Sequence, residues 1–397
     1  MNRRDNPYTP GAGRRPAYLA GRANEIGKFN DLVARITAGD FERSLIFSGL
    51  RGVGKTVLLM ELELVANEAG WITSDVQEVG SQPDFRLTFA RMAARLLREL
   101  SPQENLRSRV QRALSVVKAF SVTSPVGGLQ LQLDVEATHG VADSGDPEQD
   151  LADLLREVGQ VALDAGTAAL FVVDEMQNLP AQSLAAICIA FQAISREKLP
   201  IAFVGAGLPD LPLRLLTAKK YADRLFQYFE LGRLADDQAR LALAEPAQTK
   251  GVTFDPSVIE RVGLLSAGYP YFIQEFGREL WDHAPESPIS VSDLGDVEPL
   301  VTDGLDRTFF GPRFEMASET EQRYLAAMAS VHEGGPVASS AVMRAFGANV
   351  HQQVTALRDS VIQKDLVWSP KRGLLDFTVP LFADFLRKHH PVRNFEA

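Results

Sequence analysis

A glycine-rich segment in the first quarter of the chain constrains its fold more than any other feature. Residues 49–56 read Gly-Leu-Arg-Gly-Val-Gly-Lys-Thr and fit the pattern G-x-x-x-x-G-K-[ST], between an apolar run at 44–48 and a helical pattern at 55–69. Such glycines let backbone N–H groups turn inward around phosphate oxygens, and the next helix offers its positive end to the same anion. We therefore predict a strand, a phosphate-binding loop and a helix, and call residues 49–56 the phosphate loop. The loop positions expected to bind phosphate are Gly49, Gly52, Val53 and Gly54.

A second apolar run supplies the acids that a nucleotide site needs. Residues 170–173 are apolar and lead directly into Asp174 and Glu175. Lys55 is expected to reach the β- and γ-phosphates, and Thr56 to bind Mg²⁺. Asp174 is expected to hold the same Mg²⁺, directly or through water, while Glu175 orients or deprotonates an attacking water. These residues predict ATP and Mg²⁺ as cofactors, and hydrolysis to ADP and phosphate.

The rest of the chain alternates between helical and strand patterns, which is typical of an α/β fold with a parallel sheet. Apolar runs of strand length lie at 45–48, 71–79, 168–173, 199–204 and 226–231. The stretch 82–145 interrupts this alternation and is interpreted as an insertion, with a half-exposed strand at 129–135 in a hairpin. From residue 236 to 312 the pattern is helical, apart from 285–300, which is rich in Pro, Ser and Asp and is interpreted as a linker or loop.

Together these residues resemble AAA+ ATPases of the origin-recognition type, in the bacterial branch of ATP-binding proteins, from about residue 18 to about residue 387. They share features with the signal-transduction ATPases with numerous domains. The resemblance implies an α/β P-loop AAA+ core with a parallel sheet, an all-helical lid and a C-terminal winged-helix domain. The expected divisions are a disordered arm at 1–16, the core at 17–235, the lid at 236–312 and the winged helix at 313–397.

The resemblance also implies nucleotide contacts outside the phosphate loop. Leu19 and Arg22 precede the first helix, in the segment that packs on the adenine, although a simple loop would read the same. Tyr269 and Pro270 open a lid helix whose proline contacts the nucleotide in the signal-transduction branch. The alternative is an ordinary turn with proline at the first helical position.

Three features bear on the rate of hydrolysis. Arg224 stands where the family places an arginine finger, which acts on a neighbour's γ-phosphate and so requires self-association; a surface arginine is the alternative. The end of the fourth strand, 203–207, carries Gly and Ala where the family has a polar sensor 1 residue. The lid helix lacks the usual sensor 2 arginine. Hydrolysis is therefore expected to be slow.

The C-terminal segment has two interpretations. Three helices followed by a hairpin are the parts of a winged helix, which can bind DNA or dock a protein. The candidate DNA contacts are Gln352, Arg358, Lys371 and Arg372. Residues 313–397 hold ten Lys and Arg against nine Asp and Glu, whereas the whole chain has a net charge of −10, so broad nucleic-acid binding is not expected from charge.

The predicted function is that of a slow AAA+ ATPase acting as a nucleotide-dependent switch. A DNA-binding regulator or initiator-like factor, in which ATP only licenses assembly, is the alternative. A third hypothesis, a scaffold without hydrolysis, is disfavoured by Glu175. One cysteine and the lack of a 20-residue apolar run predict a cytoplasmic protein without membrane contact, whose partners are ATP or ADP, DNA or protein, and a second copy of the chain.

Overall fold

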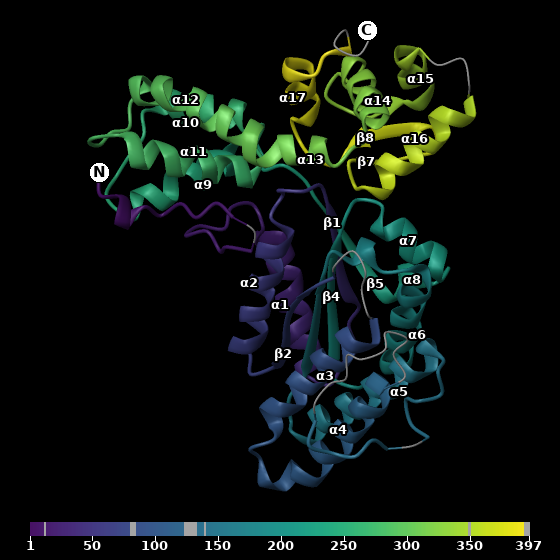
Figure 1. Cartoon of the computed structure of the whole chain (residues 1–397). Helices are drawn as coiled ribbons and strands as arrows, with labels where there is room; N and C mark the ends of the chain where they lie inside the picture. The colour runs from purple at the N-terminus through teal and green to yellow at the C-terminus, as the bar shows by residue number, and fades with distance from the viewer. Residues whose placement is uncertain (12, 80–84, 123–132, 139, 348–350, 393–397) are drawn as a thin grey trace. The chain divides into compact units, whose positions relative to one another are not determined.

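Five strands form the main sheet in the order β2-β3-β4-β1-β5 (Figure 1). They are β1 (Ser44–Gly49), β2 (Ile72–Glu78), β3 (Ala169–Asp174), β4 (Ile201–Gly207) and β5 (Phe226–Leu231). β1 pairs with β4, β4 with β3 and β3 with β2, all in parallel. Every residue of β1, β3 and β4 is buried, as expected for strands with both faces covered by helices. The predicted α/β class with a parallel sheet is confirmed.

The computed structural model describes residues 1–397 except 12, 80–84, 123–132, 139, 348–350 and 393–397. By contacts the chain divides into two units. The first unit comprises Met1–Gly21, Leu50–Gly54 and Leu231–Ala397, and the second comprises Arg22–Gly49 and Lys55–Glu230. Within the described ranges, no helix has the length and apolar character needed to cross a membrane.

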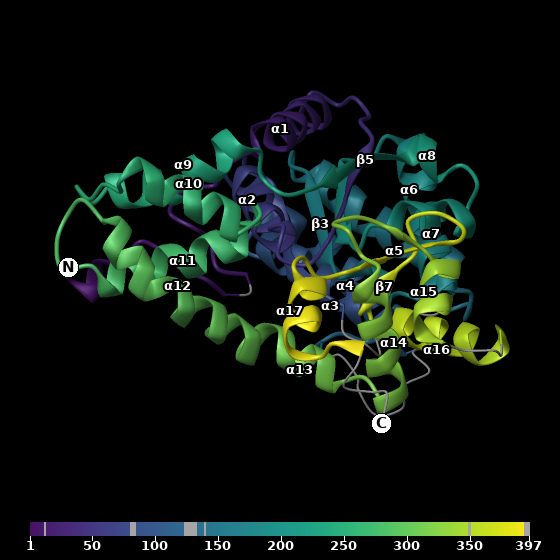
Figure 2. The ribbon, with the colours of Figure 1, turned by 90° about the horizontal axis from the view of Figure 1, so that it is seen from above.

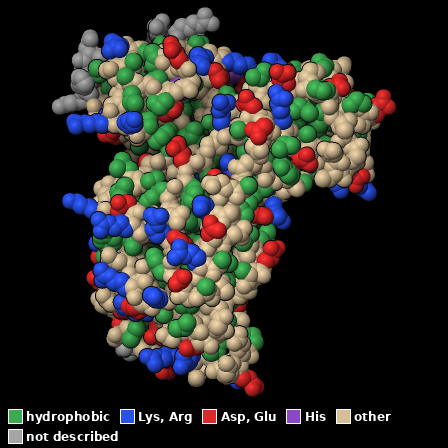
Figure 3. Space-filling model, turned by 180° about the vertical axis from the view of Figure 1, so that it is seen from behind, with side chains coloured by type: hydrophobic (Ala, Val, Ile, Leu, Met, Phe, Trp, Pro, Cys, Tyr) green, Lys and Arg blue, Asp and Glu red, His purple; other side chains and the backbone are tan. Residues whose placement is uncertain are grey.

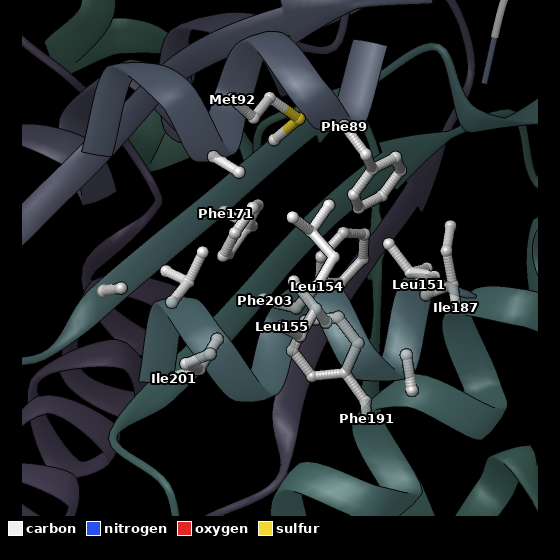
Figure 4. Close-up of a cluster of buried hydrophobic side chains, with 14 of the residues drawn as sticks. Phe89, Met92, Leu151, Leu154, Leu155, Phe171, Ile187, Phe191, Ile201 and Phe203 are labelled. Atoms are coloured by element: carbon white, nitrogen blue, oxygen red, sulfur yellow. The ribbon is translucent and has the colours of Figure 1, made fainter. Parts of the chain in front are cut away.

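The second unit contains the sheet and the helices that cover it. These helices are α1 (Ala23–Thr37), α2 (Lys55–Glu68), α3 (Phe85–Leu100), α4 (Arg107–Val122), α5 (Pro147–Asp164), α6 (Ala181–Glu197), α7 (Leu211–Ala218) and α8 (Ala222–Leu225), with short 3₁₀ turns η2 (Glu104–Leu106) and η3 (Met176–Asn178). Phe89 of α3 and Leu155 of α5 lie over Phe171 and Phe203 of the sheet, with Phe191 of α6 in the same cluster (Figure 4). This core holds the carboxyl ends of β1 and β3 in fixed positions.

The first unit is mainly helical. Its lid helices are α9 (Asp236–Gln248), α10 (Pro256–Leu265), α11 (Pro270–His283) and α12 (Val291–Leu305), which lie together in Figures 1 and 2. The chain continues through η4 (Asp306–Phe310), α13 (Gly311–Glu315), α14 (Glu319–Ser330), β6 (Val337–Ala338), α15 (Ser339–Phe346), α16 (His351–Gln363), β7 (Val367–Trp368), β8 (Leu374–Phe377) and α17 (Phe382–His389). The three helices and the hairpin predicted at the C-terminus are present, and β6 adds a third antiparallel strand.

The N-terminal arm differs from its prediction. Residues 1–9 of the predicted disordered arm pack on α9 and α11, where Tyr8 is 3% exposed and its hydroxyl donates to the carbonyl of Leu243. Trp281 donates its indole N–H to the carbonyl of Asn2 at 3.0 Å. An aromatic anchor in a Pro- and Gly-rich segment explains the error, because one buried tyrosine holds a chain that composition alone marks as loose.

Three other predictions need correction or lie outside the described residues. The expected linker at 285–300 is helical from Val291, because Ser290 and Asp293 form a capping box that starts α12. The boundary at 312/313 falls inside α13 rather than between elements. Of the strand expected at 129–135, residues 133–135 are not a strand and 129–132 lie outside the described residues.

Candidate nucleotide site

The phosphate loop connects β1 to α2 through a backbone that only glycine adopts without strain. Gly52 has φ +82° and Gly54 has φ +91°, both in the left-handed region. Val53 between them is 1% exposed. The loop therefore has the sharp turns that the sequence pattern predicted, directly before the N-terminus of α2.

Lys55 and Thr56 begin α2 and face the end of the sheet. Lys55 is 6% exposed, and its ammonium donates to the carbonyl of Gly49 at 2.9 Å. The hydroxyl of Thr56 donates to Oδ2 of Asp174 at 2.5 Å. The structure thus brings together Thr56 and Asp174, two residues that are 118 positions apart in the sequence.

Asp174 is the last residue of β3 and is 2% exposed. Burial raises the pKa of its carboxyl, while the hydrogen bonds from Thr56 and from the backbone N–H of Glu175 oppose the rise. The charge of Glu175 adds to the rise in this pKa and that of Lys55 opposes it. A buried carboxylate with a raised pKa gains from a cation, because the cation favours its charged form.

The donor atoms fit magnesium. The hydroxyl of Thr56 and the carboxylate of Asp174 are hard oxygen donors already in contact, and Mg²⁺ is held by one or two such groups together with substrate phosphates. Within the described part of the chain, no cluster of three or more His, Cys, Asp and Glu could hold a metal on its own. The site is therefore suited to a magnesium ion that arrives with a nucleotide.

Glu175 follows β3 with φ +54°, a left-handed conformation that is costly for a residue with a Cβ. Its backbone N–H donates to Oδ1 of Asp174 at 2.8 Å. Its carboxylate accepts a hydrogen bond from the side-chain amide of Gln177, a residue that the sequence reasoning did not select. The pattern Asp-Glu-x-Gln was the only signal available in the sequence.

The end of β4 has no polar side chain, as the sequence indicated, and the structure gives the reason. A Cβ on Gly205 would lie 2.2 Å from the sulfur of Met176, and one on Gly207 would lie 2.8 Å from Leu211. The turn that follows β3 therefore occupies the space into which a sensor side chain would project.

The candidate adenine and lid residues take the following positions. Leu19 is half-buried in the loop before α1, and Arg22 is 6% exposed, with its pKa lowered by burial and raised in part by Glu25. Tyr269 caps α11, which begins at Pro270, and burial raises the pKa of its phenol. The backbone N–H of Tyr271, the residue after Pro270, donates to the carbonyl of Gly52 at 3.4 Å. Both residues belong to the first unit.

Arg51 of the phosphate loop makes two contacts that sequence reasoning missed. Its guanidinium pairs with Asp365 at 3.2 Å, and its backbone N–H donates to the carbonyl of Thr378 at 3.2 Å. Residues 50–54 and both partners belong to the first unit. No sequence signal pointed to this contact, because more than 300 positions separate the residues.

The remaining candidates are Arg224 and four residues of the C-terminal segment. Arg224 is exposed on α8, the short helix before β5. Lys371 and Arg372 are exposed in the turn between β7 and β8, while Arg358 of α16 pairs with Asp359 at 2.7 Å. Gln352 lies on α16, but its side chain is outside the described part of the structure. On the face drawn in Figure 3, acidic and basic side chains are interspersed.

Comparison with known proteins gives two family matches. Residues 18–204 match the family model described as "AAA ATPase domain". Residues 307–386 match one described as "Domain of unknown function (DUF8462)". No curated protein matches the chain in sequence.

Several solved structures are similar. The Walker-type ATPase PABY2304 of Pyrococcus abyssi has a TM-score of 0.58 and 15% identity, covering 94% of this chain and 97% of that one. The Orc1 protein of Aeropyrum pernix, solved in complex with DNA, has a TM-score of 0.45 and 15% identity, covering 96% and 95%. Cdc6p from Pyrobaculum aerophilum has a TM-score of 0.44 and 13% identity, covering 95% and 97%. At these identities the first match supports the fold.

Proposed function

We propose that this AAA+ chain binds ATP, hydrolyses it slowly and acts as a nucleotide-dependent conformational switch. The match of residues 18–204 to the AAA ATPase domain supports this function. The observation that carries the proposal is the contact between Thr56 and Asp174 beside the buried Lys55. The ammonium of Lys55, the hydroxyl of Thr56 and the carboxylate of Asp174 supply the three groups that this function needs at the end of the phosphate loop.

Each residue has a defined task in this proposal. The backbone N–H groups around Val53 and the ammonium of Lys55 bind the β- and γ-phosphates. Thr56 and Asp174 would hold Mg²⁺, which when bound neutralises negative charge on the phosphate oxygens. Glu175 orients the attacking water and accepts its proton as the water oxygen bonds to phosphorus and ADP leaves.

The slow rate follows from what the end of β4 and the lid provide. Gly205 and Gly207 carry no side chain toward the γ-phosphate. The lid helix α11 begins with Pro270, and its one arginine, Arg278, pairs with Glu275 and Glu279 on the same helix. Fewer charges therefore meet the phosphate at the moment of transfer. If Arg224 supplies a charge to a neighbouring copy, the rate depends on self-association.

The switch is supported by the ion pair between Arg51 and Asp365. Arg51 lies in the segment that would surround the phosphates, and Asp365 lies in the C-terminal segment 313–397. A ligand that changes the shape of the loop would alter this contact and bias the C-terminal segment toward one of two positions.

The experiment that tests the proposal measures affinity for ATP with and without magnesium, and then turnover against protein concentration. We expect magnesium-dependent binding and a specific activity that falls on dilution in the wild type. In Arg224→Ala the activity should be low and should no longer depend on protein concentration. Adenine nucleotides that bind no better with magnesium would contradict the site. Activity strictly proportional to protein at nanomolar concentrations would contradict the finger role of Arg224.

A second candidate, a DNA-binding regulator, is favoured by one observation, the exposed Lys371 and Arg372 at the tip of the β7–β8 turn. It predicts duplex binding that requires ATP and weakens with salt. A gel shift with and without ATP at two salt concentrations separates the candidates, with the double variant Lys371→Ala, Arg372→Ala as the control. Equal binding by this variant would exclude DNA contact through the turn.

A further inference from the structure

Gln177 links the turn after β3 to the end of β4. It lies in η3, is 7% exposed, and uses both ends of its carboxamide. The amide N–H₂ donates to Oε2 of Glu175, and the amide oxygen accepts the backbone N–H of Leu208 at 3.2 Å. A buried amide with its donor and its acceptor both engaged has one orientation.

The surrounding residues are arranged to keep that orientation. A Cβ on Gly207 would lie 3.0 Å from Oε1 of Gln177, so a larger residue at the end of β4 would crowd this side chain. Arg214 of α7 donates from Nη1 to the carbonyl of Gln177 and from Nη2 to the carbonyl of Leu179 at 2.8 Å. The backbone of the turn is therefore held from α7, while the side chain is held from β4.

We propose that Gln177 is a positioning residue for Glu175 and occupies the place of the polar side chain that β4 lacks. This inference rests on the proposed function, in which Glu175 accepts a proton from the attacking water. The hydrogen bond to Oε2 fixes the carboxylate plane, so that Oε1 is directed to the water. The water proton passes to Glu175, the water oxygen bonds to the γ-phosphorus, and the bond to the ADP oxygen breaks.

Two substitutions separate the two hydrogen bonds of Gln177. Gln177→Ala removes both, whereas Gln177→Glu keeps an acceptor for the N–H of Leu208 but replaces the donor to Glu175 by a carboxylate that repels it. Gln182→Ala is the matched control, because Gln182 is an exposed glutamine five residues further along the chain, in α6. Turnover, affinity for Mg-ATP, and amide hydrogen exchange at Leu208 in nucleotide-free protein are measured for all three.

We expect kcat to fall about tenfold in both Gln177 variants, less than the roughly 10²–10⁴ that a general base contributes, with Mg-ATP affinity unchanged. Exchange at Leu208 should rise in Gln177→Ala but not in Gln177→Glu. Affinity for Mg-ADP with aluminium fluoride, relative to Mg-ADP alone, should fall in both variants. Because the residue acts through Glu175, adding Gln177→Ala to Glu175→Gln should cause no further loss.

The contrary outcomes are distinct. An unchanged kcat in Gln177→Ala would overturn the inference, and a faster one would identify a restraint on Glu175 and overturn it too. A further loss of activity in the double variant would overturn the route through Glu175. Wild-type turnover that Glu175→Gln does not reduce would instead overturn the proposed function, because Gln177 is intact in that variant.

Discussion

The hydroxyl of Thr56 donates to the carboxylate of Asp174 across 2.5 Å and so joins the first turn of α2 to the last residue of β3. The two elements are far apart in sequence, and β1, the strand that leads into α2, is separated from β3 by β4 in the sheet. This contact holds together the two side chains that we propose as magnesium ligands.

Asp174→Asn should stabilise the nucleotide-free protein and weaken magnesium binding. Burial raises the pKa of Asp174, so its charge costs folding free energy, and the neutral amide avoids that cost. The stability gain should be present at high pH and vanish as the pH falls through the raised pKa, where the wild-type carboxyl is protonated. Thermal unfolding against pH measures the gain, and titration with Mg-ATP should show a loss of more than roughly tenfold in magnesium affinity.

Glu175→Gln should leave Mg-ATP affinity intact and lower turnover by roughly 10²–10⁴, because glutamine cannot accept the water proton. Fluorescent-nucleotide binding and single-turnover hydrolysis give the two numbers. A parallel loss of binding would show that Glu175 holds the nucleotide instead of acting on water.

Exchanging the charges of Arg51 and Asp365 should change nucleotide affinity in the single variants and restore it in the double variant. The pair is about one-third exposed at each side chain, so we expect roughly 0.5–1 kcal/mol of coupling, or a two- to fivefold effect. Isothermal titration with ADP measures it. The same exchange at Arg358 and Asp359, an exposed pair on α16, is the control and should have no effect.

Removing one partner of the buried pair Arg86 and Asp150 should destabilise the second unit by about 3–5 kcal/mol. The two side chains are 5% and 0% exposed and meet at 2.6 Å, and Asp150 also accepts from Ser144 and Gly145. Asp150→Ala leaves the guanidinium of Arg86 buried without this carboxylate. Replacing both residues by apolar side chains of similar size should recover most of the loss in a hydrogen-exchange measurement. Additive losses in the double variant would contradict this account.

The pH dependence of the C-terminal segment should follow Glu321. Burial alone would raise the pKa of its carboxyl, but hydrogen bonds from Lys364, Ser360 and Ser318 lower it from 4.5 to about 2. A lowered pKa stabilises the folded state above 4.5, and this contribution, about 3 kcal/mol, is lost as the pH falls from 4.5 to 2. Acid unfolding followed by tryptophan fluorescence should show Glu321→Gln to be less stable at neutral pH. The two proteins should converge near pH 2.

Contiguous patterns carried most of the fold prediction. The phosphate loop, the acids after 170–173 and the alternation of strands and helices all depend on neighbours in the sequence, and their physical meaning is local. The errors had two causes, a distant partner for the N-terminal arm and, at 285–300, a local capping box that composition concealed. Tyr8 anchors an arm that composition marked as loose, and Ser290 with Asp293 starts a helix in a segment that is rich in loop-forming residues.

The sequence by itself determined a phosphate loop followed by two acids, because glycine conformation and strand burial act within a few residues. Only the tertiary structure decided that Gln177 holds Glu175 against β4, and that Arg51 meets Asp365. Each of these contacts depends on how separate elements pack, since a side chain selects its partner by distance in space. In the sequence, Gln177 looks like an ordinary polar turn residue. Its role depends on the packing of the turn against Gly207 at the end of β4.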